Sequence, residues 1–300
     1  MSSKPIIAVY GTNGFLGKPT IAALTSSSFV DKIQLPLRVL TRDPSKYTES
    51  KYIRYYKADA TDVDSFEDAV TGIDVFVNLG PAHHLDTPLD ALVKYAKGIK
   101  LYIPSQFGTE LDKSDTLLDG FLKVKADHSA KARAAGLKTV DVISSLFFAE
   151  GAFLTENLGV VELDKSTKSV TIRGDPTVKA DISYLPDIGK AVASIATFGD
   201  YSKLPDKIRI SSDRVSQEEI VKQYEVKHQV TLKRNYVSYE DTLADSKARW
   251  AKGFDFKDFF FYLQFLFASG TDKGLSFSKN ENELVNPKES LWTWTKFTSI

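Results

Sequence analysis

Ile6-Ile7-Ala8-Val9-Tyr10-Gly11-Thr12-Asn13-Gly14-Phe15-Leu16-Gly17 joins a short apolar run to a loop with three glycines. The continuous apolar run is typical of a strand buried inside a parallel sheet. The glycines allow a tight turn and a close approach of the backbone to a pyrophosphate. A helix expected over residues 18–27 would add free N–H groups and a positive dipole end. We therefore expect Gly11 to Gly17 to bind a dinucleotide, although an ordinary glycine-rich turn between a strand and a helix has the same pattern.

Strand-like and helix-like segments continue to alternate after this turn. Helices are expected over residues 63–70 and 122–135, the second of them closed by Gly136. Repeated alternation implies a doubly wound parallel sheet of the Rossmann type, which is an α/β fold. The further strands are expected at residues 37–41, 53–57, 74–80, 100–104 and 139–143.

The regular alternation fades beyond about residue 150. Val170 to Arg173 resembles a strand before a turn, and Tyr184 to Ala191 resembles the start of a helix with Pro186 near its first turn. We therefore expect a dinucleotide-binding Rossmann domain over residues 1–150 and a smaller α+β substrate-binding lobe over residues 151–300. No flexible linker separates them, so the two parts are expected to be closely joined and partly interleaved.

The composition argues against several kinds of partner. Lys and Arg number 39, as do Asp and Glu, and no basic tract is present, so we expect no nucleic-acid partner. The most apolar window, residues 256–268, is too short for a bilayer, which needs ~20 residues. We expect a buried helix there and no membrane partner.

Cysteine is absent, which excludes disulfides and thiolate chemistry and fits the cytoplasm. The start, Met1 to Tyr10, lacks the apolar stretch of a signal peptide. No histidine or carboxylate stands at a clear metal-ligand spacing, so a metal site is not expected. His83-His84 is interpreted as a surface or substrate-cleft pair.

Arg42, at the end of the second predicted strand, indicates which dinucleotide binds. An NAD site usually has an acidic residue there, which accepts a hydrogen bond from the ribose 2′-hydroxyl. The planar guanidinium of Arg42 suits a 2′-phosphate, and Lys46 adds charge from the loop. Asp43 is a nearby acid that keeps NAD open, and Arg42 could also be a solvated surface arginine. The sequence favours NADP.

Two further strand ends are expected to contact the cofactor. Asp59 follows the third predicted strand, and Asn78-Leu79-Gly80 ends the fourth. In open α/β sheets the carboxyl ends of the strands line the ligand crevice. We expect Asp59 on the adenine side and the backbone of Asn78, Leu79 and Gly80 beside the adenosine ribose. Each could equally serve as a cap or turn residue.

Lys125 is the candidate catalytic residue. Classical short-chain dehydrogenases place tyrosine and lysine four residues apart, on one face of a helix. Here Phe121 takes the tyrosine position and has no proton to give, while Lys125 remains. Burial or a nearby cationic ring would lower the pKa of this lysine and let it act as a general acid or base. It could also be a solvated helix lysine, like Lys123.

Three stretches together resemble the isoflavone reductase and phenylcoumaran benzylic ether reductase group, which are NmrA-like atypical short-chain dehydrogenases. They are the glycine turn, Tyr102-Ile-Pro-Ser-Gln-Phe-Gly108, and Val124-Lys125 with Gly136 and the strand that ends in Ser144-Ser145. The similarity covers residues 5–155 well and becomes patchy to about residue 195.

The resemblance implies NADPH as the cofactor. It places the glycine turn on the pyrophosphate, Arg42 on the 2′-phosphate and Lys125 on the nicotinamide ribose. It also implies cofactor contacts at Ser105, Gln106 and Phe107. Two departures leave the plant substrates of this group open: Gln106 stands where the family usually has glutamate, and Leu146-Phe147-Phe148 stands where many plant members have an asparagine.

These observations predict an NADPH-dependent reductase of a small aromatic or apolar compound with a carbonyl or enone, in which Lys125 is the general acid or base. Two alternatives remain: a redox-sensing regulator that binds NADP(H) without turnover, and a scaffold protein on a degenerate Rossmann fold. The sequence does not indicate the oligomeric state.

Overall fold

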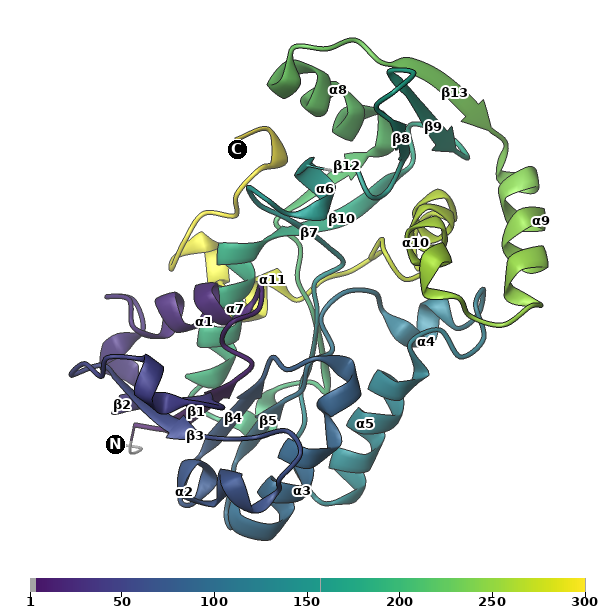
Figure 1. The fold of residues 1–300 in the computed structure, drawn as a ribbon. Coiled ribbons are helices and arrows are strands. Elements are labelled where there is room, and N and C mark those ends of the chain that lie inside the picture. The colour runs from purple at the N-terminus through teal and green to yellow at the C-terminus, as the bar shows by residue number, and fades with distance from the viewer. Residues whose placement is uncertain (1–3, 157, 300) are drawn as a thin grey trace.

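A parallel sheet with helices on both faces forms the N-terminal half of the chain (Figure 1). The computed structural model describes residues 4–156 and 158–299, so the first three residues of the expected Rossmann domain lie outside the described residues. The strand order is β3-β2-β1-β4-β5, and every pairing is parallel, which confirms the expected doubly wound α/β fold. The strands are β1 (Ile6–Tyr10), β2 (Gln34–Thr41), β3 (Ile53–Lys57), β4 (Val75–Asn78) and β5 (Leu101–Ile103).

The order of the strands fixes where a ligand can bind. The chain runs outward from β1 to β2 and β3, then crosses back to β4 on the other side of β1. Helices that follow β1 and β4 therefore leave the sheet on opposite faces, and a crevice opens at the carboxyl ends of these two strands. The glycine turn after β1 lies at this point.

The sheet continues beyond β5 with segments from both halves of the chain. A parallel bridge joins Tyr102 to Thr139, and β6 (Asp141–Ile143) follows. β6 in turn pairs in parallel with β11 (Lys207–Arg209), which lies far along the chain. The division expected near residue 150 stays a prediction, but the sheet itself includes a strand from the later half.

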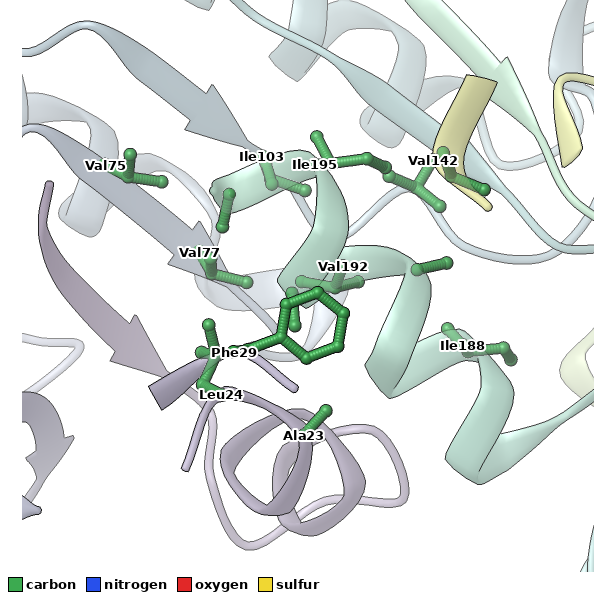
Figure 2. Close-up of a cluster of buried hydrophobic side chains, with 14 of the residues drawn as sticks. Ala23, Leu24, Phe29, Val75, Val77, Ile103, Val142, Ile188, Val192 and Ile195 are labelled. Atoms are coloured by element: carbon green, nitrogen blue, oxygen red, sulfur yellow. The ribbon is translucent and has the colours of Figure 1, made fainter. Parts of the chain in front are cut away.

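Alternating side chains of the sheet enter two separate cores. Ile7 and Val9 of β1 face one side, together with α1 (Gly17–Leu24) and α7 (Leu185–Ala196). Figure 2 shows other side chains of this cluster, among them Leu24 of α1 and Ile188 of α7. Ala8 and Tyr10 face the other side, with α2 (Glu67–Val70) and α3 (Asp86–Tyr95). Both faces are covered, which explains why β1 is apolar without alternation.

Gly189 allows α7 to pack directly on α1. A Cβ atom at Gly189 would lie 2.5 Å from the backbone carbonyl carbon of Pro19, which is closer than any real contact allows. Only a residue without a side chain therefore permits this helix crossing. A helix from the later half of the chain thus covers the helix that starts at the glycine turn.

The remaining chain forms a smaller lobe with its own core. Two three-stranded sheets have the orders β12-β10-β7 and β13-β9-β8. Their core includes aromatic side chains of α10 (Phe259–Ala268), and it also receives Phe121 from the N-terminal half. The strands are β7 (Leu146–Phe148), β8 (Glu162–Asp164), β9 (Ser169–Arg173), β10 (Lys179–Tyr184), β12 (Asp213–Ser216) and β13 (Lys233–Val237).

Two helices start later than expected, because the residues before them form a 3₁₀ turn. Residues 64–66 form a 3₁₀ turn before the short α2, instead of one helix over residues 63–70. The expected buried helix over residues 256–268 starts three residues later, because Asp255 caps a 3₁₀ turn and Phe256 is 77% exposed. The other helices are α4 (Leu111–Ser114), α5 (Lys123–Ala134), α6 (Phe153–Glu156), α8 (Gln217–His228), α9 (Tyr239–Trp250), α10 (Phe259–Ala268) and α11 (Asn282–Val285).

The helix α10 is buried from Phe261 onward and packs beside α9. Within residues 4–156 and 158–299, no helix is long and apolar enough to cross a membrane.

Candidate active site

A cavity of about 530 Å³ opens at the carboxyl ends of β1 to β4, at the crevice that the strand order predicts. It is lined by parts of the glycine turn and by the ends of these four strands. The lining residues are Tyr10, Gly11, Thr12, Asn13, Gly14, Leu40, Thr41, Arg42, Asp59, Ala60, Thr61, Leu79, Pro81 and His84.

The three glycines of the turn have different steric roles. Gly11 has a φ of +85°, and a Cβ there would lie 2.3 Å from the carbonyl carbon of Leu79. A Cβ at Gly17 would lie 2.4 Å from the backbone of Thr12. At Gly14 the nearest atom would be 3.6 Å away, so its missing side chain leaves room at the cavity rather than inside the protein. Gly11 and Gly17 therefore shape the turn, while Gly14 allows a ligand to approach the backbone.

The turn also presents hydrogen-bond donors. Gly14 N–H donates to the carbonyl of Gly11, and Gly17 N–H donates to the carbonyl of Gly14. The N–H groups of Phe15 and Leu16 have no acceptor among the residues that the structure describes. Free N–H groups at the start of α1 are a suitable site for the diphosphate of a dinucleotide, so the residues fit such a group.

Arg42 is exposed at the rim of this cavity, whereas its acidic neighbour is occupied elsewhere. Asp43 accepts hydrogen bonds from the N–H and the hydroxyl of Ser45, which hold the pKa of this carboxyl below its usual range. Lys46 is 75% exposed and lies 3.4 Å from Asp43. Because Asp43 is satisfied by its own loop, Arg42 is the charged group of this loop that faces the cavity.

Asp59 lines the cavity but is also part of its own turn. Its carboxylate accepts from the N–H and the hydroxyl of Thr61, and these bonds lower its pKa. Asp59 therefore has both positions that the sequence left open, because it stabilises its own turn and also lines the cavity.

Asn78 is buried, and its side chain fixes the turn after β4. Its Oδ1 accepts from Gly80 N–H at 2.9 Å, and its Nδ2 donates to the hydroxyl of Tyr102 at 3.0 Å. Gly80 lies against the ring of Tyr10. A Cβ atom at Gly80 would lie 2.7 Å from this ring. Of the predicted segment, only Leu79 lines the cavity, and Asn78 and Gly80 support it from behind.

The sequence reasoning missed His128, which extends this network to α5. The Tyr102 hydroxyl lies 2.7 Å from His128 Nε2, and His128 Nδ1 lies 3.3 Å from Asp86. Because Asn78 donates to Tyr102, the phenol hydrogen goes to Nε2 and the imidazole hydrogen sits on Nδ1, facing Asp86. Burial lowers the pKa of His128 and raises that of Tyr102, so both are neutral at pH 7. The sequence did contain a signal for His128: it follows Lys125 by three residues, a spacing that places both side chains on the same side of a helix.

Lys125 lies on the first turn of α5, next to the loop that follows β5. Its Nζ donates to the carbonyls of Gln106 and Phe107 at 3.2 and 3.3 Å. Burial lowers the pKa of this ammonium from its usual value to about 8. Lys123 is instead exposed and ion-paired with Asp127, so the two lysines have different environments.

Phe121 is part of an aromatic cluster with Trp250, Phe254, Phe259 and Tyr262, with ring centroids 6.2 or 6.3 Å from its own. The position that carries the classical tyrosine is therefore used for packing between the two halves of the chain. No hydroxyl stands there.

The structure brings together only part of the predicted site. The cavity is lined by Gly11, Thr12, Asn13, Gly14, Arg42, Asp59 and Leu79, and Phe15, Leu16 and Gly17 complete the same turn. Ser105, Gln106, Phe107 and Lys125 lie together at the neighbouring strand end and do not line this cavity. Gln106 and Phe107 are buried, and the Gln106 side chain points at α5 rather than at the cavity.

Other lining residues were not predicted as contacts. Six of them line the cavity because they flank the predicted strand ends: Tyr10, Leu40, Thr41, Ala60, Thr61 and Pro81. His84 lines it as well, so one member of the histidine pair faces this crevice. No group of metal-ligating side chains occurs among the described residues.

The parallel order β3-β2-β1-β4-β5 and the glycine turn at the switch point define a Rossmann-type protein. The NmrA-like family model matches residues 3–274, and the chain belongs to the NmrA-like family. The expected resemblance to phenylcoumaran benzylic ether reductases and isoflavone reductases is confirmed.

Relatives of known name belong to the same group. Phenylcoumaran benzylic ether reductase Pyrc5 of Pyrus communis is 29% identical over 262 residues, which cover 81% of each chain. The solved complex of leucoanthocyanidin reductase with NADPH from Vitis vinifera has a TM-score of 0.71 at 19% identity, with 95% of both chains covered. Structures of pinoresinol-lariciresinol and phenylcoumaran benzylic ether reductases give 0.70 at 22% identity, with 91% of this chain and 90% of theirs covered.

Proposed function

We propose that this protein is an NADP-dependent oxidoreductase that reduces a small aromatic or apolar compound with a carbonyl or enone group. The observation that carries the proposal is the glycine turn, which opens into a cavity of about 530 Å³ with Arg42 at its rim. The names of its relatives, reductases among them, support the same class of activity.

Residues of the turn and of the loop after β2 would hold the cofactor. The free N–H groups of Phe15 and Leu16 would bind the diphosphate, and the gap at Gly14 would let it approach. The guanidinium of Arg42 would bind the 2′-phosphate, with Lys46 adding charge nearby. Asp59 and Leu79 would flank the adenosine. When bound, NADPH supplies the hydride.

Lys125 would manage the proton. Its ammonium is held by two carbonyls and has a pKa of about 8, so it is mostly protonated at pH 7 but gives up a proton easily. As a general acid it would donate a proton to the substrate oxygen while the neighbouring carbon is reduced. The opposite direction would need the neutral amine, which becomes the major form above about pH 8.

Binding is the first test. NADPH and NADH are titrated against the protein by fluorescence, and aromatic enones and quinones are then screened for oxidation of the bound cofactor. Arg42→Ala removes a charge-assisted contact to phosphate, so we expect NADPH to bind about 10- to 100-fold more weakly and NADH to change by less than about threefold. Arg54→Ala is the matched control, because Arg54 is an exposed arginine of β3 that does not line the cavity.

Three outcomes separate this proposal from its alternatives. Equal losses for NADPH and NADH in Arg42→Ala contradict the 2′-phosphate assignment. Tight NADPH binding without turnover of any compound in the panel supports the redox-sensing regulator instead. A folded protein with no affinity for either dinucleotide contradicts both.

A further inference from the structure

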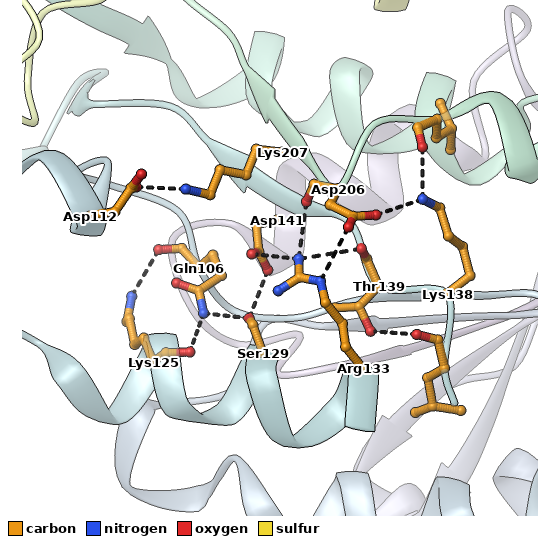
Figure 3. Close-up of polar contacts among 12 residues, drawn as sticks. Gln106, Asp112, Lys125, Ser129, Arg133, Lys138, Thr139, Asp141, Asp206 and Lys207 are labelled. Carbon is orange, nitrogen blue, oxygen red and sulfur yellow. Dashed lines mark hydrogen bonds and ion pairs between the residues drawn. The ribbon is translucent and has the colours of Figure 1, made fainter. Parts of the chain in front are cut away.

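A network of hydrogen bonds connects β6 to the backbone of α5, the helix that carries Lys125 (Figure 3). Asp141, in β6, accepts from the Ser129 hydroxyl at 2.7 Å. The Ser129 oxygen accepts from Gln106 Nε2 at 2.6 Å, and the same Nε2 donates to the backbone carbonyl of Lys125. Lys125 Nζ returns to the carbonyl of Gln106. Gln106, Ser129 and Asp141 are buried, so the network is shielded from water.

The hydrogen-bonding groups on either side of residue 106 determine which side chain suits this position. The carboxylate of Asp141 and the carbonyl of Lys125 are both acceptors only. The Ser129 hydroxyl gives its single hydrogen to Asp141, so its oxygen can only accept from position 106. In this arrangement the side chain at position 106 donates twice, which the amide of glutamine can do and a carboxylate cannot.

We propose that Gln106 is a positioning residue for Lys125: its amide, braced by Ser129 and Asp141, holds the first turn of α5 so that the lysine ammonium stays on the carbonyls of Gln106 and Phe107. This inference rests on the proposed function, in which Lys125 handles the proton. It gives the Gln106 side chain a role in place of a direct cofactor contact.

Gln106 also keeps a negative charge away from the lysine. Lys125 has no carboxylate partner in the described part of the chain, whereas four other lysines and arginines of the surrounding elements are in ion pairs. These pairs are Lys123 with Asp127, Arg133 with Asp141, Lys207 with Asp112, and Arg209 with Glu110. A glutamate at position 106 would face two acceptors and would place an unpaired negative charge close to Lys125, whose ammonium donates to the carbonyl of the same residue.

The test measures the titration of Lys125 directly. Each lysine of the purified full chain is labelled with trace acetic anhydride between pH 6 and 11, and the yield at Lys125 is read by mass spectrometry. In the unchanged protein we expect a midpoint at about 8. Gln106→Glu should raise it to about 9 or higher, because an unpaired carboxylate nearby favours the charged lysine by about one pKa unit or more.

Two further variants complete the design. Gln34→Glu adds the same charge at an exposed position at the start of β2 and should leave the Lys125 midpoint unchanged. Ser129→Ala removes one acceptor of Gln106 without adding charge, and it serves if Gln106→Glu does not fold. Its loosened turn gives the ammonium more water, so the midpoint should again rise, by less than in Gln106→Glu.

The labelling needs neither cofactor nor substrate. It can therefore contradict the positioning role of Gln106 independently of whether the protein is a reductase. A midpoint that stays at the unchanged protein's value in folded Gln106→Glu, or in folded Ser129→Ala, overturns the positioning role even if the protein is an active reductase. A protein that turns over no substrate, but whose midpoint rises in Ser129→Ala, which adds no charge, keeps the positioning role and loses the reductase.

Discussion

Lys125 has a cost to stability that follows from its position. Its ammonium is partly buried and has only two neutral carbonyls as partners, so folding lowers its pKa to about 8 and makes the charged form less favourable than in water. The unfolded chain has no such preference, because there the lysine is fully hydrated. A residue kept at such a cost is typical of a functional site rather than of packing.

Lys125→Met should therefore stabilise the protein while it removes activity. At pH 7 we expect a gain of about 1 kcal/mol, after allowance for the partial exposure of Lys125, and a Tm higher by about 2 °C. Reduction of a substrate should fall by at least about 100-fold, the contribution typical of a general acid. Lys123→Met, at an exposed lysine in an ion pair, should change neither quantity appreciably.

The stability gain should depend on pH in a defined direction. The folded-state pKa of Lys125 is about 8 and lies below that of the unfolded chain. Between these two values the unfolded chain binds the extra proton, so the unchanged protein becomes more stable as the pH rises. The advantage of Lys125→Met is therefore full below pH 8 and shrinks above it. Thermal unfolding at pH 7 and at pH 10 measures this, and an equal advantage at both values contradicts a buried ammonium.

At the scale of the element, the turn between β1 and α1 combines two requirements in one short loop. Gly17 is needed for the turn to close on Thr12, and Gly14 is needed only if a ligand approaches. The sequence identified the turn from its strand–glycine–helix order, and the structure assigns the separate steric role of each glycine.

These roles predict opposite results for two alanine substitutions. Gly17→Ala places a methyl group 2.4 Å from backbone atoms, so we expect a loss of at least about 2 kcal/mol in the free energy of unfolding. Gly14→Ala meets its first neighbour at 3.6 Å and should leave the Tm within about 2 °C, yet weaken NADPH binding by at least about tenfold. Thermal unfolding and fluorescence titration of both variants measure the difference. Unchanged NADPH binding in Gly14→Ala contradicts the approach of the diphosphate at this glycine.

The helix that carries Lys125 shows where sequence patterns are insufficient. Phe121 and Lys125 were identified from their spacing, and helix α5 begins within a residue of the expected position. The bonds of Gln106 to α5 and of Tyr102 to His128 join residues 19 to 26 positions apart. Such pairings depend on how β5 and α5 pack, so no local periodicity contains them. The exposure of Phe256 was missed for the same reason, because an aromatic run alone does not reveal which residues the α10 packing covers.

At the scale of the whole molecule, the two expected domains share their structural elements. β11 extends the sheet of the first half, and α7 fills the core on one of its faces (Figure 2). The sequence predicted the first five strands and the crevice between them, because each strand is a local apolar run. It could not predict β11 as a sheet member, since a strand of three residues has no pattern of its own.

A fragment of residues 1–150 should therefore not fold cooperatively. Without α7, the apolar face that includes Ile7, Val9, Val75 and Val77 loses its cover and is exposed to water. We expect broad thermal unfolding and binding of a hydrophobic dye, in contrast to the full chain. A fragment of residues 1–210, which retains α7 and β11, is the matched comparison. A sharp transition for residues 1–150 would establish an independent domain boundary there.

The contact of Gly189 with Pro19 has a consequence for how such a protein can be rebuilt or can diverge. Helix α1, which starts at the glycine turn, packs backbone against backbone on a helix that lies some 170 residues later in the sequence, so the two segments must change together. An exchange of the first 150 residues with those of a relative would bring a new α1 against an old α7. Such a hybrid would need the region around Gly189 from the same donor before α1 and α7 could pack as closely as they do here.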